Sequence, residues 1–80
     1  MAGCPARDRS TIERHLQKTL QHVSVGATLI DRQRTIVATL ADHRRPSDTA
    51  RKLLEELEAI QAMHMAQRDR LIDELARCDA

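Results

Sequence analysis

The chain has 80 residues, of which 41% are hydrophobic and 31% charged, with a formal net charge of +1 and no Phe, Tyr or Trp. This length allows one domain, and a chain so short and without aromatic rings builds only a small core of its own, so we expect it to depend on partners. No apolar run approaches the roughly 20 residues of a membrane span, and the first residues lack the apolar stretch of a signal peptide, which together predict a cytoplasmic protein.

The first half of the chain is predicted to be one long helix. Residues 1–9 are expected to form a disordered tail, and Ser10 with Glu13 matches the Ser-x-x-Glu capping box, so the helix is predicted over residues 10–43. Its apolar residues recur at helical spacing, with one row every seven residues and a second row beside it: Leu16, Val23, Ile30 and Val37, then Ile12, Leu20, Ala27 and Leu40.

An alternative is that residues 23–30 and 35–40 are β-strands, because both are rich in β-branched side chains. The intervening residues 31–34 contain no Gly, Asn or Pro to form a hairpin turn, and the seven-residue spacing continues through them. The helix is therefore favoured.

A single strong break separates this helix from the second. Pro46 cannot continue a helix and disfavours helical backbone at the residue before it, which places a turn at residues 44–47. Ser47 can cap a second helix, predicted over residues 48–77. The apolar residues of this segment share one helix face: Ala50, Leu53, Leu54, Leu57, Ile60, Leu71, Leu75 and Cys78.

A short connection between long helices makes them antiparallel neighbours, so the predicted fold is an all-α helical hairpin over residues 10–78. Facing residues are expected to have numbers that total about 91, which places Gly26 opposite His64 or Met65. A glycine inside a helix costs about 1 kcal/mol relative to alanine, so we expect close approach of the second helix, or room for the imidazole, to compensate.

The contact between the two predicted helices, which we call the seam, does not accommodate all the apolar side chains. Five of them project to the side of the seam and are predicted to form a dimer or partner interface: Val25, Leu29, Ile36, Leu40 and Met63. Scattered surface residues are an alternative, since much of any folded surface is apolar. A row on one face favours a homodimer in which two hairpins form a four-helix bundle.

In the middle of the second helix, polar residues take the positions that face the first helix. This polar layer lies between Leu57 and Leu71 and has four members: Gln61, His64, Gln67 and Arg68. A buried polar layer can set register and oligomeric state, and it can also contact a partner or ligand. We expect Arg68 to reach an acidic group or the rim, because an unpaired buried guanidinium is costly.

Catalytic and metal-binding patterns are missing from the sequence. His15 and His22 are two helical turns apart, and there is no His-x-x-x-His or Glu-x-x-His. Two helices offer no pocket in which a nucleophile and a base could be oriented. Cys4 and Cys78 are too few for a disulfide scaffold and match no zinc spacing. We therefore expect no enzyme activity, cofactor, metal or small-molecule substrate.

Nucleic acid is the main alternative partner. A basic cluster surrounds the predicted turn and could contact phosphates: Arg44, Arg45, Arg51 and Lys52. The low total charge and the lack of aromatic rings for base stacking favour ordinary solvated charge instead.

Three segments carry a resemblance to other proteins: Gly26-x-x-x-Ile30-x-Arg32-Gln33-Arg34-x-Ile36-Val37-x-x-Leu40, Asp48-Thr49-Ala50-Arg51-x-Leu53-Leu54 and His64-x-Ala66-x-Arg68-Asp69-Arg70-Leu71. Over residues 15–75 the chain resembles a group of small uncharacterised bacterial proteins. The resemblance implies a two-helix shape and no established activity. The prediction from sequence is thus a non-enzymatic interaction or regulatory module that binds itself and another protein, with a small RNA- or DNA-binding hairpin dimer as the alternative.

Overall fold

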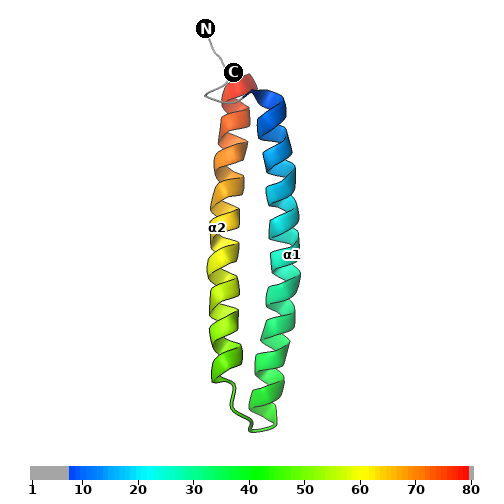
Figure 1. The fold of residues 1–80 in the computed structure, drawn as a ribbon, viewed down its shortest axis with the longest axis vertical. Helices are drawn as coiled ribbons and strands as arrows, with labels where there is room; N and C mark the ends of the chain where they lie inside the picture. Colours follow the sequence, from blue (N-terminus) through cyan, green and yellow to red (C-terminus); the bar gives the residue numbers. More distant parts are fainter. Residues whose placement is uncertain (1–7, 80) are drawn as a thin grey trace.

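The computed structural model describes residues 8–79, which form two α-helices joined by a short connection (Figure 1). Helix α1 spans Arg9–Asp42 and helix α2 spans Asp48–Asp79. The helices are antiparallel and form a rod with principal extents of 63 × 14 × 14 Å. The predicted all-α hairpin is confirmed, with helix bounds within two residues of the prediction. Most of the tail predicted over residues 1–9 lies outside the described residues.

The N-terminus of α1 is capped two residues earlier than the sequence predicted. Asp8 is the N-cap, and its carboxylate accepts a hydrogen bond from the Thr11 N–H at 2.8 Å. The Ser10 hydroxyl donates to the same carboxylate at 3.1 Å, and Glu13 pairs with Arg9 at 2.7 Å, so the capping box predicted from Ser10 and Glu13 is wrong. Asp8 takes the position because a carboxylate at a helix N-terminus also interacts favourably with the helix dipole.

The C-terminus of α1 ends in a Schellman motif. The Arg45 N–H donates to the Leu40 carbonyl at 2.9 Å and the Arg44 N–H donates to the Ala41 carbonyl at 3.0 Å. Arg44 has a φ of 54°, the left-handed conformation that this motif requires and that glycine usually supplies. The chain then passes through Pro46 to Ser47, whose carbonyl accepts the first helical bond of α2 from the Arg51 N–H at 2.9 Å.

The seam of α1 alternates spacings of four and three residues. Its members are buried or half-buried: Ile12, Leu16, Thr19, Val23, Gly26, Ile30, Gln33, Val37 and Leu40. Leu20 and Ala27 were predicted in this row, but Leu20 is 45% exposed and Ala27 is also exposed. The polar or small residues one position earlier in the chain take their places, because only those positions continue the 3–4 spacing set by Leu16 and Ile30.

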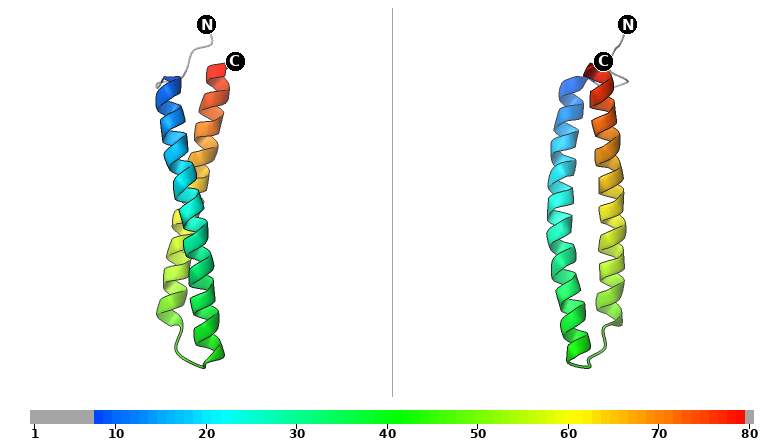
Figure 2. Two further views of the ribbon diagram at one scale, coloured as in Figure 1. Left: turned by 90° about the vertical axis from the view of Figure 1, so that its right-hand side faces the viewer. Right: turned by 180° about the vertical axis from the view of Figure 1, so that it is seen from behind.

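The seam of α2 has the same spacing. It consists of Ala50, Leu54, Leu57, Gln61, His64, Arg68, Leu71, Leu75 and Cys78. Leu53 and Ile60, predicted on this face, are 45% and 48% exposed. Figure 2 shows the two helices crossing at a shallow angle, as 3–4 spacing produces. Across the described residues, the buried apolar side chains are Ile12, Ile30 and Leu71.

Neither helix of this part of the chain has an apolar stretch that could cross a membrane.

The register of the hairpin differs from the prediction by about one turn. Gln61, rather than His64 or Met65, lies against Gly26. The residue numbers of Gly26 and Gln61 sum to 87, whereas the prediction was a sum of about 91. The other close seam pairs are Val23 with Gln61 and Gln33 with Ala50, which total 84 and 83. The physical reason is the asymmetric connection: after the Schellman motif the chain runs back along the end of α1, so α2 begins above the last turn of α1 (Figure 1).

The Asp8 cap predicts a defined pH dependence. The Thr11 N–H, with the Thr11 and Ser10 hydroxyls, lowers the pKa of Asp8 from its ordinary 3.8. Because the pKa is lower in the folded state, the cap stabilises the fold above pH 3.8, and this contribution is lost as the pH falls below it. Asp8→Asn keeps the cap without titrating. The wild type should therefore unfold at a higher temperature than the variant at neutral pH, with a gap that narrows upon acidification; a gap independent of pH would contradict this role.

The left-handed conformation of Arg44 leads us to expect that its substitution by glycine stabilises the fold. A side chain in the left-handed region costs roughly 1 kcal/mol that glycine avoids, so Arg44→Gly should raise the free energy of unfolding by up to about 1 kcal/mol in chemical denaturation. The matched control is Arg45→Gly, because Arg45 does not have positive φ. There the greater backbone entropy of glycine in the unfolded chain should lower stability. Equal effects of the two substitutions would show that the conformation of Arg44 is not strained.

Candidate interaction surface

Two glutamines reach across the seam in opposite directions. Gln33 of α1 donates from Nε2 to the Ala50 carbonyl of α2 at 2.9 Å. Gln61 of α2 donates from Nε2 to the Val23 carbonyl of α1 at 2.8 Å. Each bond joins a side chain to the backbone of the other helix, so sliding one helix along the other would break both. Gln33 was not singled out from the sequence, although its place three residues after Ile30 was a signal for the seam.

Gln61 owes its position to Gly26. A Cβ on Gly26 would collide with Oε1 of the Gln61 amide, so the missing side chain makes room for this amide. Oε1 of Gln61 is buried and has no hydrogen-bond partner in the described part of the chain, which reduces the net stabilisation from this residue. Gly26 therefore accommodates a polar amide, and not the imidazole that the sequence had suggested.

The predicted polar layer of α2 divides in two. His64 and Arg68 share the seam with Gln61, whereas Gln67 lies beside it and is half-buried. The His64 ring lies 4.9 Å from the His22 ring of α1, centroid to centroid, at 36°. Arg68 donates from Nε to Asp69 at 3.0 Å while its side chain stays 27% exposed. Within residues 8–79 there is no cluster of three or more metal-ligating side chains.

One side of the hairpin, which we call the front face, carries a row of exposed apolar side chains from both helices. They are 41–58% exposed: Val25, Leu29, Ile36, Leu53, Ile60 and Met63. Leu40, predicted for this row, instead lies in the seam and is half-buried. Leu53 and Ile60 were missed because they were assigned to the seam; their seven-residue separation, equal to that of Leu29 and Ile36, was the available signal.

A groove of about 490 Å³ opens on the front face where α1 lacks a side chain at Gly26. Its walls are mostly apolar, from Val25 and Leu29 of α1 and Leu57 and Ile60 of α2, and the imidazoles of His22 and His64 lie at one end. The groove is open to solvent along the rod. Its shape and lining suit an apolar side chain inserted from another molecule.

The basic cluster at the turn is balanced by acidic residues. The four cations predicted as a nucleic-acid contact are all exposed: Arg44, Arg45, Arg51 and Lys52. Four carboxylates share the same segment and are also exposed: Asp42, Asp48, Glu55 and Glu56. Because a phosphate backbone is bound through excess positive charge, this balance makes the turn a weak phosphate-binding surface.

Cys78, at the end of α2, is disulfide-bonded. The other cysteine of the sequence, Cys4, lies outside the described residues. Because disulfides persist mainly in oxidising compartments, the cysteines do not support a cytoplasmic location, which stays a prediction.

Comparisons with family models, with curated proteins and with solved structures find no match to this chain. What the site can do therefore has to be argued from its own residues. It offers apolar side chains on one face, a groove, two adjacent imidazoles and a seam register held by two amide bonds.

Gly26 and Gln61 should be energetically coupled. In a Gln61→Ala background, Gly26→Ala should stabilise the fold by about 1 kcal/mol, because only helix propensity changes. With Gln61 present, the added Cβ displaces the amide and breaks its bond to Val23, which costs on the order of 1 kcal/mol and cancels the gain. A double-mutant cycle from chemical denaturation measures this coupling. Additive effects would show that the contact with Gly26 does not hold Gln61 in place.

Proposed function

We propose that the protein is a non-enzymatic protein–protein interaction module whose first partner is a second copy of itself, bound through the front face. The observation that carries this proposal is the row of six large apolar side chains that remain 41–58% exposed on one side. By contrast, the apolar side chains buried within the described residues are Ile12, Ile30 and Leu71. A chain that exposes more large apolar side chains than it buries gains stability by association.

The total surface supports the same proposal. The chain exposes 6061 Å², whereas a folded monomer of 9.1 kDa exposes roughly 4,900 Å² by the usual scaling with mass. The excess, about 1,200 Å², is larger than the roughly 800 Å² that one partner contributes to a standard protein–protein interface.

Packing two hairpins against each other would form a four-helix bundle. The front-face side chains would become a second core layer, and the groove beside Gly26 would receive a side chain of the other copy. Such a bundle has a simple use: it presents the outer faces of four helices to a further protein, while the seam of each hairpin keeps its register.

The test is to place charge in the front face. Leu29→Glu with Ile60→Glu should leave the hairpin helical and weaken self-association by at least tenfold in analytical ultracentrifugation, because two carboxylates would have to be desolvated in the interface. The matched control is Ala66→Glu, an exposed residue of α2 that neither precedes nor follows a seam position. It should associate as the wild type does.

Two results would contradict the proposal. One is a wild-type chain that sediments as a folded single copy at every concentration. The other is a doubly substituted chain that associates as tightly as the control.

A further inference from the structure

The side opposite the front face carries a second, smaller apolar patch. Leu20, Met65 and Ile72 are 45%, 40% and 48% exposed. Each follows a seam residue by one position, whereas each apolar residue of the front face precedes a seam residue by one. In an antiparallel pair, the residues that precede seam positions lie on one side and those that follow lie on the other. We call this opposite side the back face.

The two faces carry opposite net charge. Among residues that precede seam positions, four cations stand against two carboxylates, a net +2: Lys18, Arg32, Arg70 and Arg77, against Glu56 and Glu74. Among described side chains that follow seam positions, two cations stand against five carboxylates, a net −3: Arg34 and Arg51, against Glu13, Asp31, Glu55, Glu58 and Asp69. Two front faces would therefore repel each other weakly, and a front face would attract a back face.

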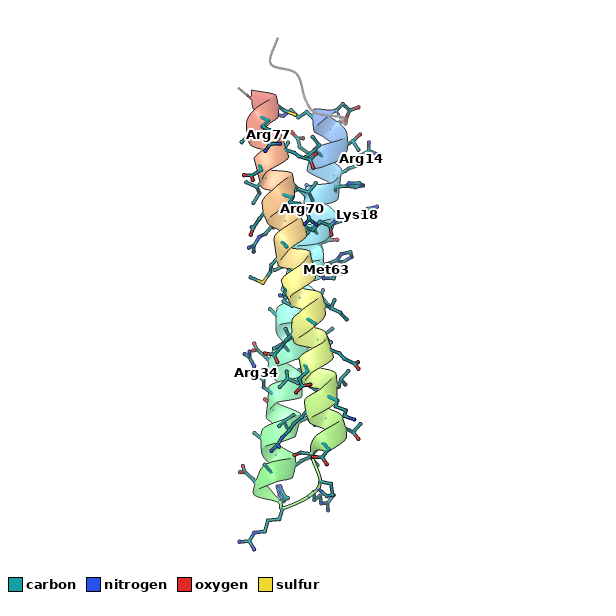
Figure 3. The ribbon with its side chains drawn as sticks, turned by 90° about the vertical axis from the view of Figure 1, so that its left-hand side faces the viewer. Arg14, Lys18, Arg34, Met63, Arg70 and Arg77 are labelled. Carbon is teal, nitrogen blue, oxygen red and sulfur yellow. The ribbon has the colours of Figure 1, made fainter. Side chains whose placement is uncertain are left out.

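The apolar patches also lie at different heights along the rod. The front row extends from the middle of the hairpin toward the turn, whereas Leu20 and Ile72 lie nearer the other end of the rod, where α1 begins and α2 ends. Three front-face cations, Lys18, Arg70 and Arg77, lie in this same end of the rod (Figure 3). A contact that joins both apolar patches must therefore either stagger the two copies along their long axes or turn one copy end for end.

We infer that the front face of one hairpin binds the back face of a second copy. This inference rests on the self-association proposed above and specifies which surfaces meet. The contact is heterologous, so a pair of bound copies still offers one free front face, on one copy, and one free back face, on the other. Association then continues beyond the dimer instead of closing. Exposed ion pairs are each weak, so the apolar patches supply the affinity and the charges select the orientation.

The test uses one variant blocked on each face. The front variant is Leu29→Glu with Ile60→Glu, and the back variant is Met65→Glu with Ile72→Glu. In sedimentation velocity the wild type should form species larger than a dimer as its concentration rises. Each variant alone should remain a single copy. An equimolar mixture should form a 1:1 complex that stops at the dimer, because the intact back of one variant meets the intact front of the other.

The outcomes separate this inference from the proposed function. A back variant that associates as the wild type does would overturn the front-to-back contact and leave front-to-front association standing. A wild type that never associates would overturn both proposals. Circular dichroism checks the folding of each variant. If the back variant loses helicity, Ala62→Arg, at an exposed position that follows Gln61, blocks the same face with a single change and must likewise abolish self-association.

Discussion

A glutamine from each helix donates a hydrogen bond to the backbone of the other helix, and the register of the hairpin depends on these two contacts. Gln33 and Gln61 lie on different helices and reach in opposite directions. Hydrophobic packing alone does not distinguish well between registers one turn apart, because leucine, isoleucine and valine side chains can repack with little loss. A directed amide bond does distinguish them, because a misaligned seam would leave buried polar groups without partners.

The register in turn decides which surface the hairpin exposes. Because Gln61 occupies the space over Gly26, the row that contains Ile60 is rotated out of the seam and onto the front face. On α1, the 3–4 spacing set by Leu16 and Ile30 likewise leaves polar residues, such as Thr19 and Gln33, facing the other helix. A seam of this composition buries few apolar side chains, and the apolar residues it does not use form the two exposed patches. The contacts that align the helices therefore leave apolar side chains exposed, and this exposed apolar surface favours association with a partner.

Polar groups also determine where the helices begin and end. Asp8, and not Ser10, caps α1, and Arg44 adopts a left-handed conformation so that a Schellman motif can close its last turn. This motif sends the chain back along α1 and shifts the start of α2. The turn geometry and the two glutamines therefore act together: one limits how α2 can begin, and the other selects its alignment.

The sequence by itself determined the two helices, their break at Pro46 and their antiparallel arrangement, because helical periodicity and the geometry of proline are properties of neighbouring residues. It also indicated a front-face row through Val25, Leu29, Ile36 and Met63. Only the tertiary structure decided that Leu20, Leu53 and Ile60 are exposed, that Leu40 lies in the seam and not on the front face, that Gln33 lies in the seam, and that Gln61 faces Gly26. The physical reason is that an apolar stripe on a helix is wide enough to allow several rotations. The choice among them depends on contacts between residues 17 to 38 positions apart in the chain, which no local pattern records.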